Sequence, residues 1–264
     1  MDWSDSISKG LVGCWLFNEG GGYFAYDIAG KNKGTLTNMA FPSTATSGWG
    51  VGKFGKALNF DGTNDYVALP SAFFNTAHRS VSIRFKIFTL HTGMVFSGGT
   101  GNPNRWYMTP QVGGTINMRV GGGAEFSIGA SYVLGAEHHM VATYDAVNVH
   151  TYLDGVQRNS QANSTLSGSA NVNIGSFNNG VSNFFNGIVY GVSIYNRALS
   201  AGEVKRLYSE PFAGILTPVR RMVNTVAASG SLIKTINGLA RSSVSGYNGL
   251  ALASIKTING LSNQ

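Results

Sequence analysis

The stretch FFNGIVYGVSIYNRALSAGEVKRLY (residues 184–208) contains both patterns from which the fold can be predicted. Its first half alternates apolar with small or polar residues, as expected of a strand that covers a core with one face. In its second half, Ser200 is followed three residues later by Glu203, which is the spacing of a helix capping box. The stretch therefore predicts a strand followed by one short helix, which Pro211 would close.

Short apolar runs of the first kind recur along the chain from Leu11 to Tyr195, rich in Val, Ile, Tyr and Phe and separated by Gly, Asn and Asp. Clear examples are LVGCWLF, ALNFDG, DYVALP, SVSIRFKIF, HHMVATYD and VHTYLDG. Many short strands with turn signals between them are typical of a β-sandwich or jelly roll. The chain is therefore predicted to be all-β, with one short helix near the end of the sandwich.

Four segments resemble, in order, the signatures of the LamG-like branch of the concanavalin A-like lectin/glucanase superfamily. They are KGLVGCWLFNEGGG (9–22), KFGKALNFDGTNDYVALP (53–70), EHHMVATYDAVNVHTYLDGV (137–156) and the stretch 184–208. The resemblance covers about residues 8–209 and implies an antiparallel two-sheet jelly roll. It says little about the ligand, because this fold serves lectins, hydrolases, adhesion modules and structural parts alike.

Composition allows one main domain with an appendage: the chain has 264 residues, of which 43% are hydrophobic and 12% charged. No membrane-spanning run or secretory signal is visible, and the one cysteine, Cys14, is expected to be buried. The net charge is +7, and from Pro211 onward there are basic residues but no acidic ones. These cations are too sparse for nucleic-acid binding, so we expect the tail to dock on an acidic protein surface.

The C-terminal tail consists of three eleven-residue units, GSLIKTINGLA, RSSVSGYNGLA and LASIKTINGLS. A helix with an eleven-residue period is disfavoured by the Asn-Gly pairs, so each unit is predicted to be an extended segment with an Asn-Gly turn. Such short units cannot bury their own apolar residues and should pack on a partner. The matched positions, which we predict to mediate assembly, are Ile233, Ile236, Leu239, Val244, Tyr247, Leu250, Ile255, Ile258 and Leu261. The predicted divisions are thus a jelly roll (1–209), a linker (210–229) and an attachment tail (230–264).

Catalytic patterns are weak, and we predict that the protein is not an enzyme. The glucanases that this sequence resembles carry Glu-x-Asp-x-x-Glu on one strand, and no such array is present. Asp61 and Asp65 are expected to make turn hydrogen bonds. GVGKFGKA (50–57) nearly matches a phosphate-binding loop, but the segment after it has the pattern of a strand, so a turn is predicted.

A metal site is also not predicted, and no cofactor is expected. His138 and His139 are neighbours on a strand and should face opposite sides, so they cannot bind one ion together. Related modules often bind Ca²⁺ through an early Asp and a later acidic pair. Asp27 matches the first, but residues 189–191 are Val, Tyr and Gly. A structural Ca²⁺ is left open by this pattern but not supported.

Sugar recognition combines an aromatic face with amide and guanidinium groups, and the best local match is Asn104, Arg105, Trp106 and Tyr107. The alternative is that Trp106 and Tyr107 alternate between core and solvent on an ordinary strand. Trp49 is a weaker second candidate for stacking on a sugar.

A virion surface is the predicted location. EPFAGILTPVRR (210–221) resembles the segment after LamG-like modules in tailed-bacteriophage structural proteins, where similar repeats occur. The expected function is a non-enzymatic capsid decoration, tail or fibre component that is assembled in the host cytoplasm. It would be homo-oligomeric, contact other virion subunits through the tail, bind no membrane, and recognise surface glycans. The alternatives are a bacterial carbohydrate-binding or adhesion module and a glycan hydrolase.

Overall fold

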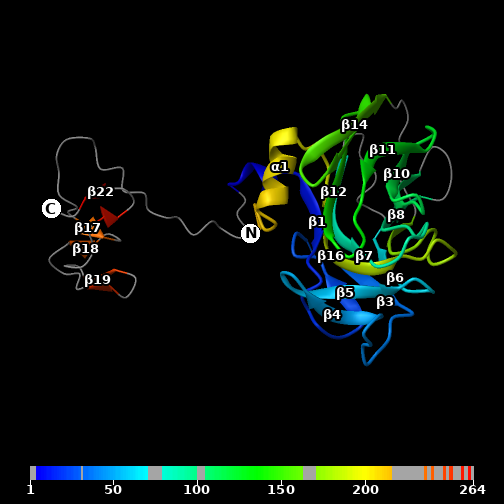
Figure 1. Ribbon diagram of the computed structural model, residues 1–264, viewed down its shortest axis with the longest axis horizontal. Coiled ribbons are helices and arrows are strands. Elements are labelled where there is room, and N and C mark those ends of the chain that lie inside the picture. The colour runs from blue at the N-terminus through cyan, green and yellow to red at the C-terminus, as the bar shows by residue number, and fades with distance from the viewer. Residues whose placement is uncertain are drawn as a thin grey trace. The chain divides into compact units, whose positions relative to one another are not determined.

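The computed structural model describes residues 4–30, 32–70, 79–99, 105–162 and 171–215, together with six two-residue strands between residues 235 and 262. It divides into two compact units, Met1–Leu216 and Thr217–Gln264. The first unit is built from two antiparallel sheets packed face to face, as Figure 1 shows. The predicted antiparallel β-sandwich is therefore confirmed.

One sheet, here called the helix-side sheet, carries the short helix α1 (Ala201–Ser209) on its outer face. Its order is β14 (Val156–Ala162), β13 (Asn148–Leu153), β12 (Glu137–Tyr144), β7 (Arg79–Ile87), β16 (Asn186–Tyr195), β5 (Gly55–Asp61) and β4 (Gly48–Gly52), with β1 (Leu11–Trp15) also paired to β16. The other sheet runs β11 (Phe126–Ser131), β10 (Thr115–Val120), β9 (Trp106–Pro110), β8 (Phe96–Gly98), β15 (Val172–Ile174), β6 (Tyr66–Leu69), β3 (Lys33–Thr37) and β2 (Phe24–Tyr26).

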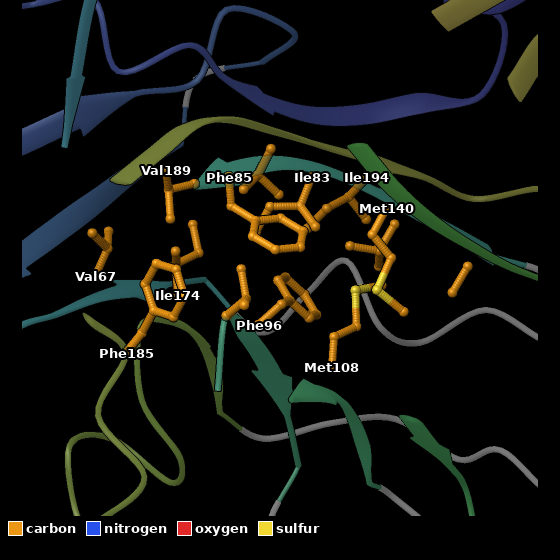
Figure 2. Close-up of a cluster of buried hydrophobic side chains, with 14 of the residues drawn as sticks. Val67, Ile83, Phe85, Phe96, Met108, Met140, Ile174, Phe185, Val189 and Ile194 are labelled. Carbon is orange, nitrogen blue, oxygen red and sulfur yellow. The ribbon is translucent and has the colours of Figure 1, made fainter. Parts of the chain in front are cut away.

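The main core fills the space between the sheets. In β7 the alternate residues Val81, Ile83, Phe85 and Ile87 all point inward and are at most 1% exposed. Figure 2 shows Ile83 and Phe85 facing side chains of the opposite sheet, among them Phe96 and Met108. Burying one such side chain contributes about 1.5–3 kcal/mol to the free energy of folding. The alternation of apolar residues in the sequence is therefore a main source of the stability of the sandwich.

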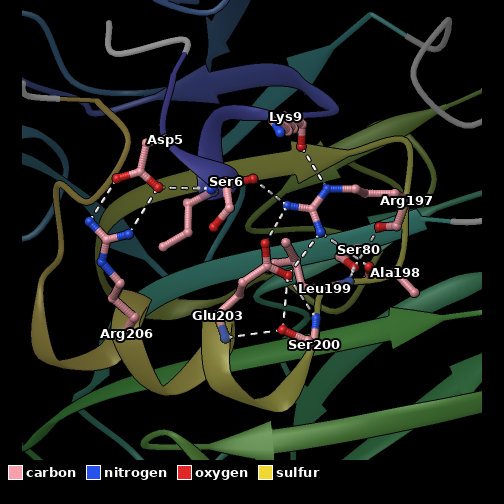
Figure 3. A network of polar contacts seen from close by, with 11 residues as sticks. Asp5, Ser6, Lys9, Ser80, Arg197, Ala198, Leu199, Ser200, Glu203 and Arg206 are labelled. Carbon is pink, nitrogen blue, oxygen red and sulfur yellow. Dashed lines mark hydrogen bonds and ion pairs between the residues drawn. The ribbon is translucent and has the colours of Figure 1, made fainter.

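A second apolar cluster lies on the outer face of the helix-side sheet, where α1, the turn η1 (Ser6–Ser8) and the residues after α1 cover it. Polar contacts fasten these segments together, as Figure 3 shows. Arg197 donates to the carbonyls of Ser6 and Lys9, each at 2.7 Å, and pairs with Glu203 of the capping box. Arg206 makes a bidentate ion pair with Asp5 at 2.9 and 2.7 Å.

The first unit extends beyond the predicted end at residue 209. Ala213 is only 7% exposed in the second apolar cluster, and the Ser8 hydroxyl donates to the Gly214 carbonyl at 2.7 Å. The first residues of the predicted linker therefore belong to the sandwich, because they help to cover the outer face of the helix-side sheet.

The second unit contains three hairpins of identical register. They are β17 (Thr235–Ile236) with β18 (Leu239–Ala240), β19 (Gly246–Tyr247) with β20 (Leu250–Ala251), and β21 (Thr257–Ile258) with β22 (Leu261–Ser262). The extended pattern predicted for the repeats is thus confirmed in the part of the tail that is described. Ile233, Val244 and Ile255 lie outside the described residues.

Candidate functional site

The stretch predicted to bind sugar lies at the start of β9, and Trp106 points into the core with 0% exposure. The prediction that its indole ring is available for stacking is therefore wrong, and the alternative reading as an ordinary strand accounts for it. Tyr107 faces the other side, is 6% exposed, and donates from its hydroxyl to Glu125 at 2.5 Å. Arg105 lies 5.8 Å from the Phe177 ring centre, and Asn104 lies outside the described residues.

Trp49 is also mostly buried, at 7% exposure, and its indole N–H donates to the Gly22 carbonyl at 2.8 Å. The wrong prediction for Trp106 and the burial of Trp49 have one cause. A jelly roll of this size uses its large aromatic side chains to fill the space between the sheets, and sequence alone does not tell which face of a strand a Trp occupies.

A pocket on the outer face of the helix-side sheet is the best-formed candidate site. It has a volume of about 90 Å³ and lies beside α1. The sheet contributes residues of β5, β7, β12 and β16, the N-terminal segment contributes Leu16 and Asn18, and the segment after α1 closes the other side. We call it the helix-side pocket; its central residues are Asn18, Phe54, Lys56, Ser82, Arg84, His139, Tyr190, Ser193 and Phe212.

The stretch GVGKFGKA (50–57) supplies one wall of this pocket. It forms the hairpin between β4 and β5, with Gly52 paired to Gly55, so the predicted turn is confirmed. Gly55 has a φ of +125°, a conformation that a residue with a side chain rarely adopts. This turn places Phe54 over the sheet and sends Lys56 to the edge of the pocket.

Three aromatic rings frame the pocket through edge-to-face contacts. The Phe54 ring centre lies 6.3 Å from that of Tyr190 and 5.7 Å from that of Phe212, with interplanar angles of 80° and 83°. Such contacts hold large side chains at low entropic cost and leave apolar surface toward the hollow.

His139 forms part of the lining and is only 1% exposed. Its Nε2 lies 2.8 Å from the Ser82 hydroxyl, whereas its Nδ1 has no hydrogen-bond partner among the described residues. Burial, reinforced by the nearby charge of Arg84, lowers the pKa of His139 to about 3, although Asp154 opposes the shift. The imidazole is therefore neutral at physiological pH and offers one unused hydrogen-bonding atom.

His138 points to the other face of the sheet, as predicted from the alternation along a strand. Its Nδ1 donates to Asp154 at 2.9 Å, and its Nε2 accepts from the Val133 N–H at 2.9 Å. The two histidines thus cannot bind one metal ion. Within the described part of the chain, no group of three or more His, Cys, Asp or Glu side chains is arranged to hold a metal.

Cationic side chains gather around the pocket. Arg84 donates to Glu137 at 3.1 Å and to the carbonyls of Leu207 and Tyr208 at the end of α1, at 2.5 and 2.7 Å. Lys53 also pairs with Glu137, at 3.2 Å. Lys56 is exposed and forms no ion pair within the described residues. Glu137 therefore pairs with two of these cations, Arg84 and Lys53.

The carboxylates singled out in the sequence serve the fold. Asp61 accepts from the N–H of Thr63 at 2.7 Å, which confirms the predicted turn. Asp65 is 0% exposed and accepts from the Asp61 N–H at 3.1 Å; burial raises its pKa to about 6. Asp27 accepts from the N–H groups of Cys14 and Ala29, each at 2.8 Å. Since Asp65 is sealed from solvent, it cannot act on a polysaccharide in this conformation.

No helix in the described residues has both the length and the apolar character that crossing a bilayer requires. This statement covers α1, which has nine residues.

Comparison with known proteins agrees with this architecture. A sequence profile described as the concanavalin A-like lectin/glucanases superfamily matches residues 61–205, more than half of the chain. No curated protein matches the chain. Several solved structures resemble it at identities that establish the fold alone.

One similar structure is domain 4 of AbnA, an extracellular GH43 arabinanase from Geobacillus stearothermophilus, in complex with arabinotriose. It has a TM-score of 0.59 and 22% identity, and the match covers 75% of this chain and 98% of that one. The sialidase of Trypanosoma rangeli in complex with sialic acid has a TM-score of 0.60 and 18% identity, over 75% of this chain and 32% of the sialidase. The receptor-binding domain of botulinum neurotoxin mosaic serotype C/D has a TM-score of 0.57 and 11% identity, over 77% and 51%. This chain therefore spans about a third of the sialidase and half of the toxin domain. With the profile match, the chain belongs to the concanavalin A-like lectin/glucanase superfamily.

Proposed function

We propose, for a chain that belongs to the concanavalin A-like lectin/glucanase superfamily, a non-enzymatic role in binding carbohydrate at the surface of a virion. The first unit supplies the binding module. The repeats of the second unit supply attachment to the particle and assembly into multiple copies.

The observation that carries the binding role is the helix-side pocket. Phe54 and Tyr190 offer apolar ring surface, while Asn18, Lys56 and His139 offer polar atoms beside it. Sugar rings have one apolar face and a rim of hydroxyl groups, so this combination suits them. It is consistent with this role that a similar domain of an arabinanase was solved with arabinotriose bound.

The non-enzymatic assignment is supported by the way the carboxylates are used. Glycosidases need two carboxyl groups that flank a bound sugar, one of them with a raised pKa. Glu137 beside the pocket is held by Arg84 and Lys53, and the acid with a raised pKa, Asp65, is 0% exposed. We expect no release of product from polysaccharides.

The virion role is supported by the tail. Three hairpins of two-residue strands offer little area for burial on their own, which favours packing on other subunits. The resemblance of residues 210–221 to phage structural proteins gives the context, with assembly in the host cytoplasm and display on a capsid, tail or fibre. Several linked copies would raise the avidity of a weak single site.

A glycan array with the full chain tests the binding role. Tyr190→Ala removes one aromatic wall and should lower binding about tenfold, equivalent to about 1.4 kcal/mol. Tyr26→Ala is the matched control, because Tyr26 is 57% exposed on β2 of the other sheet. Equal binding by wild type and Tyr190→Ala would show that the helix-side pocket is not the site.

Immunogold imaging of particles tests the location. Failure to label the particle surface would contradict the virion role.

A further inference from the structure

We propose that the helix-side pocket takes an acidic sugar residue, whose hydroxyl groups bind His139 and whose carboxylate binds Lys56. This inference deepens the proposed function and rests on it. Two independent features carry it, namely an unpaired polar atom on a side chain that lines the pocket and an exposed lysine without an ion pair at the edge of the pocket.

The unused atom is Nδ1 of His139. A buried polar atom without a partner costs about 1–3 kcal/mol, so native structures seldom leave one unpaired unless a ligand or water completes it. Whichever way the proton lies between Nε2 and Ser82, Nδ1 is left as either a donor or an acceptor. A sugar hydroxyl can both donate and accept, so it satisfies either arrangement.

The groups that surround His139 keep this hydrogen-bonding atom neutral. Arg84 lies on the neighbouring strand β7, Asp154 in the turn between β13 and β14, and Tyr208 of α1 stacks on the imidazole with ring centres 6.2 Å apart. Arg84 stays charged from pH 5 to 8, and so does Asp154, because its burial is outweighed by hydrogen bonds from His138 and the His139 N–H that lower its pKa, whereas the pKa of His139 is about 3. His139 therefore neither attracts nor repels an anion, and selection by charge must come from elsewhere.

The charge at the edge comes from Lys56. Glu137 pairs with Lys53 and Arg84, whereas Lys56 is exposed and forms no ion pair within the described residues. The stem of Lys56 lies against the backbone at Gly20, where an added Cβ would stand 3.3 Å from its Cγ and Cε. Gly20 has a φ of +73°, a conformation that glycine adopts readily. Because glycine has no Cβ, the stem of Lys56 can lie against the backbone at this position.

The remaining polar groups fit the hydroxyl groups of the same ring. Burial raises the pKa of Tyr190, with a further contribution from Glu137, so its phenol stays protonated and can donate. Asn18 adds an amide with both a donor and an acceptor. A carboxylate beside Lys56 and hydroxyl groups beside Tyr190 and Asn18 together describe a uronic acid or a related acidic sugar.

The experiment compares two sugars that differ only at one carbon, methyl glucuronide and methyl glucoside, by calorimetric titration into the full chain. At low salt the acid should bind about tenfold more tightly, since a single close charge pair in partly exposed surroundings contributes on the order of 1 kcal/mol or more. Lys56→Gln should abolish this preference, so that methyl glucuronide binds this variant no more tightly than methyl glucoside does. Added salt should reduce it in the wild type.

The matched control is Lys205→Gln, which removes one exposed cation from α1 outside the pocket lining and should keep the preference. His139→Phe should weaken both sugars equally, and its melting curve shows whether it folds. Equal affinity for both sugars, lost in Tyr190→Ala, would leave the proposed function standing and overturn the acidic-sugar inference. If neither sugar binds at tens of millimolar, both proposals are wrong.

Discussion

The two faces of the helix-side sheet differ in chemistry although the same strands supply both. In β7, Ile83 and Phe85 point inward to the apolar core, whereas Ser82 and Arg84 point outward to the pocket and α1. In β12, His138 has both ring nitrogens paired, while His139 one residue later keeps one nitrogen free of described partners. The inner face is therefore mainly apolar and closed, whereas the outer face carries polar groups around a hollow.

The two faces also differ in how the sequence builds them. The inner face is specified by the local alternation of apolar residues along each strand. The outer face is assembled from segments far apart in the chain, through contacts such as Arg206 with Asp5 and Ser8 with Gly214. The first arrangement fixes the sandwich, and the second leaves a hollow between its parts.

The inner face should show the largest loss on substitution. Phe85→Ala removes a side chain that is 1% exposed and in edge contact with Phe185, with ring centres 6.4 Å apart. We expect the free energy of unfolding to fall by about 3–5 kcal/mol. Denaturant melts measure this, and a loss below about 1 kcal/mol would contradict a tightly packed core.

The outer face should respond less. Leu207→Ala trims a side chain of α1 that is 5% exposed and lines the pocket. We expect a loss of about 2–3 kcal/mol, since the covering segments can partly close the gap. The same variant should weaken carbohydrate binding, which Phe85→Ala should do only where it unfolds the protein. If both variants cost the same stability, the two faces are equally well packed.

The fastening of α1 should depend on pH through Glu203. Burial favours its neutral form, but hydrogen bonds from Arg197 and Ser200 outweigh this and hold the pKa at about 2, below the usual 4.5. The group therefore stabilises the fold above pH 4.5, and this contribution is lost as the pH falls toward 2. Glu203→Gln should cost about 1–2 kcal/mol at pH 7 and much less near pH 2.5. Glu210→Gln, an exposed acid at the end of α1, is the control and should change little at either pH.

Sequence predicted the inner face better than the outer one. The alternation in residues 184–195 and the spacing of Ser200 and Glu203 are local, and strand β16 and the capped helix both formed as predicted. The pocket could not be predicted from the sequence, because its lining residues come from segments far apart in the chain and no short motif indicates that these segments lie together. The polar neighbours of Trp106 favour a sugar site in the sequence, but the strand register directs its side chain inward. The glycines of residues 50–57 predict a tight turn, which the structure confirms, but they do not indicate the pocket beside it.

The smallest effect on stability is expected from removing the tail, provided that the residues covering the outer face of the helix-side sheet are kept. The first unit is complete at Leu216, and its last described contacts include buried Ala213 and the bond from Ser8 to Gly214. Truncation after Leu216 should thus leave the melting curve of the sandwich unchanged, while the protein no longer joins its oligomer or particle.

Truncation after Glu210 is the matched comparison. This cut removes Phe212 and the residues that cover the second apolar cluster. It should lower the free energy of unfolding by about 1–3 kcal/mol and open one side of the pocket. Light scattering and melting curves of both truncations measure these effects. Normal assembly after the cut at Leu216 would show that the repeats do not mediate assembly, and identical melts for both cuts would show that residues 211–216 contribute nothing to the outer face.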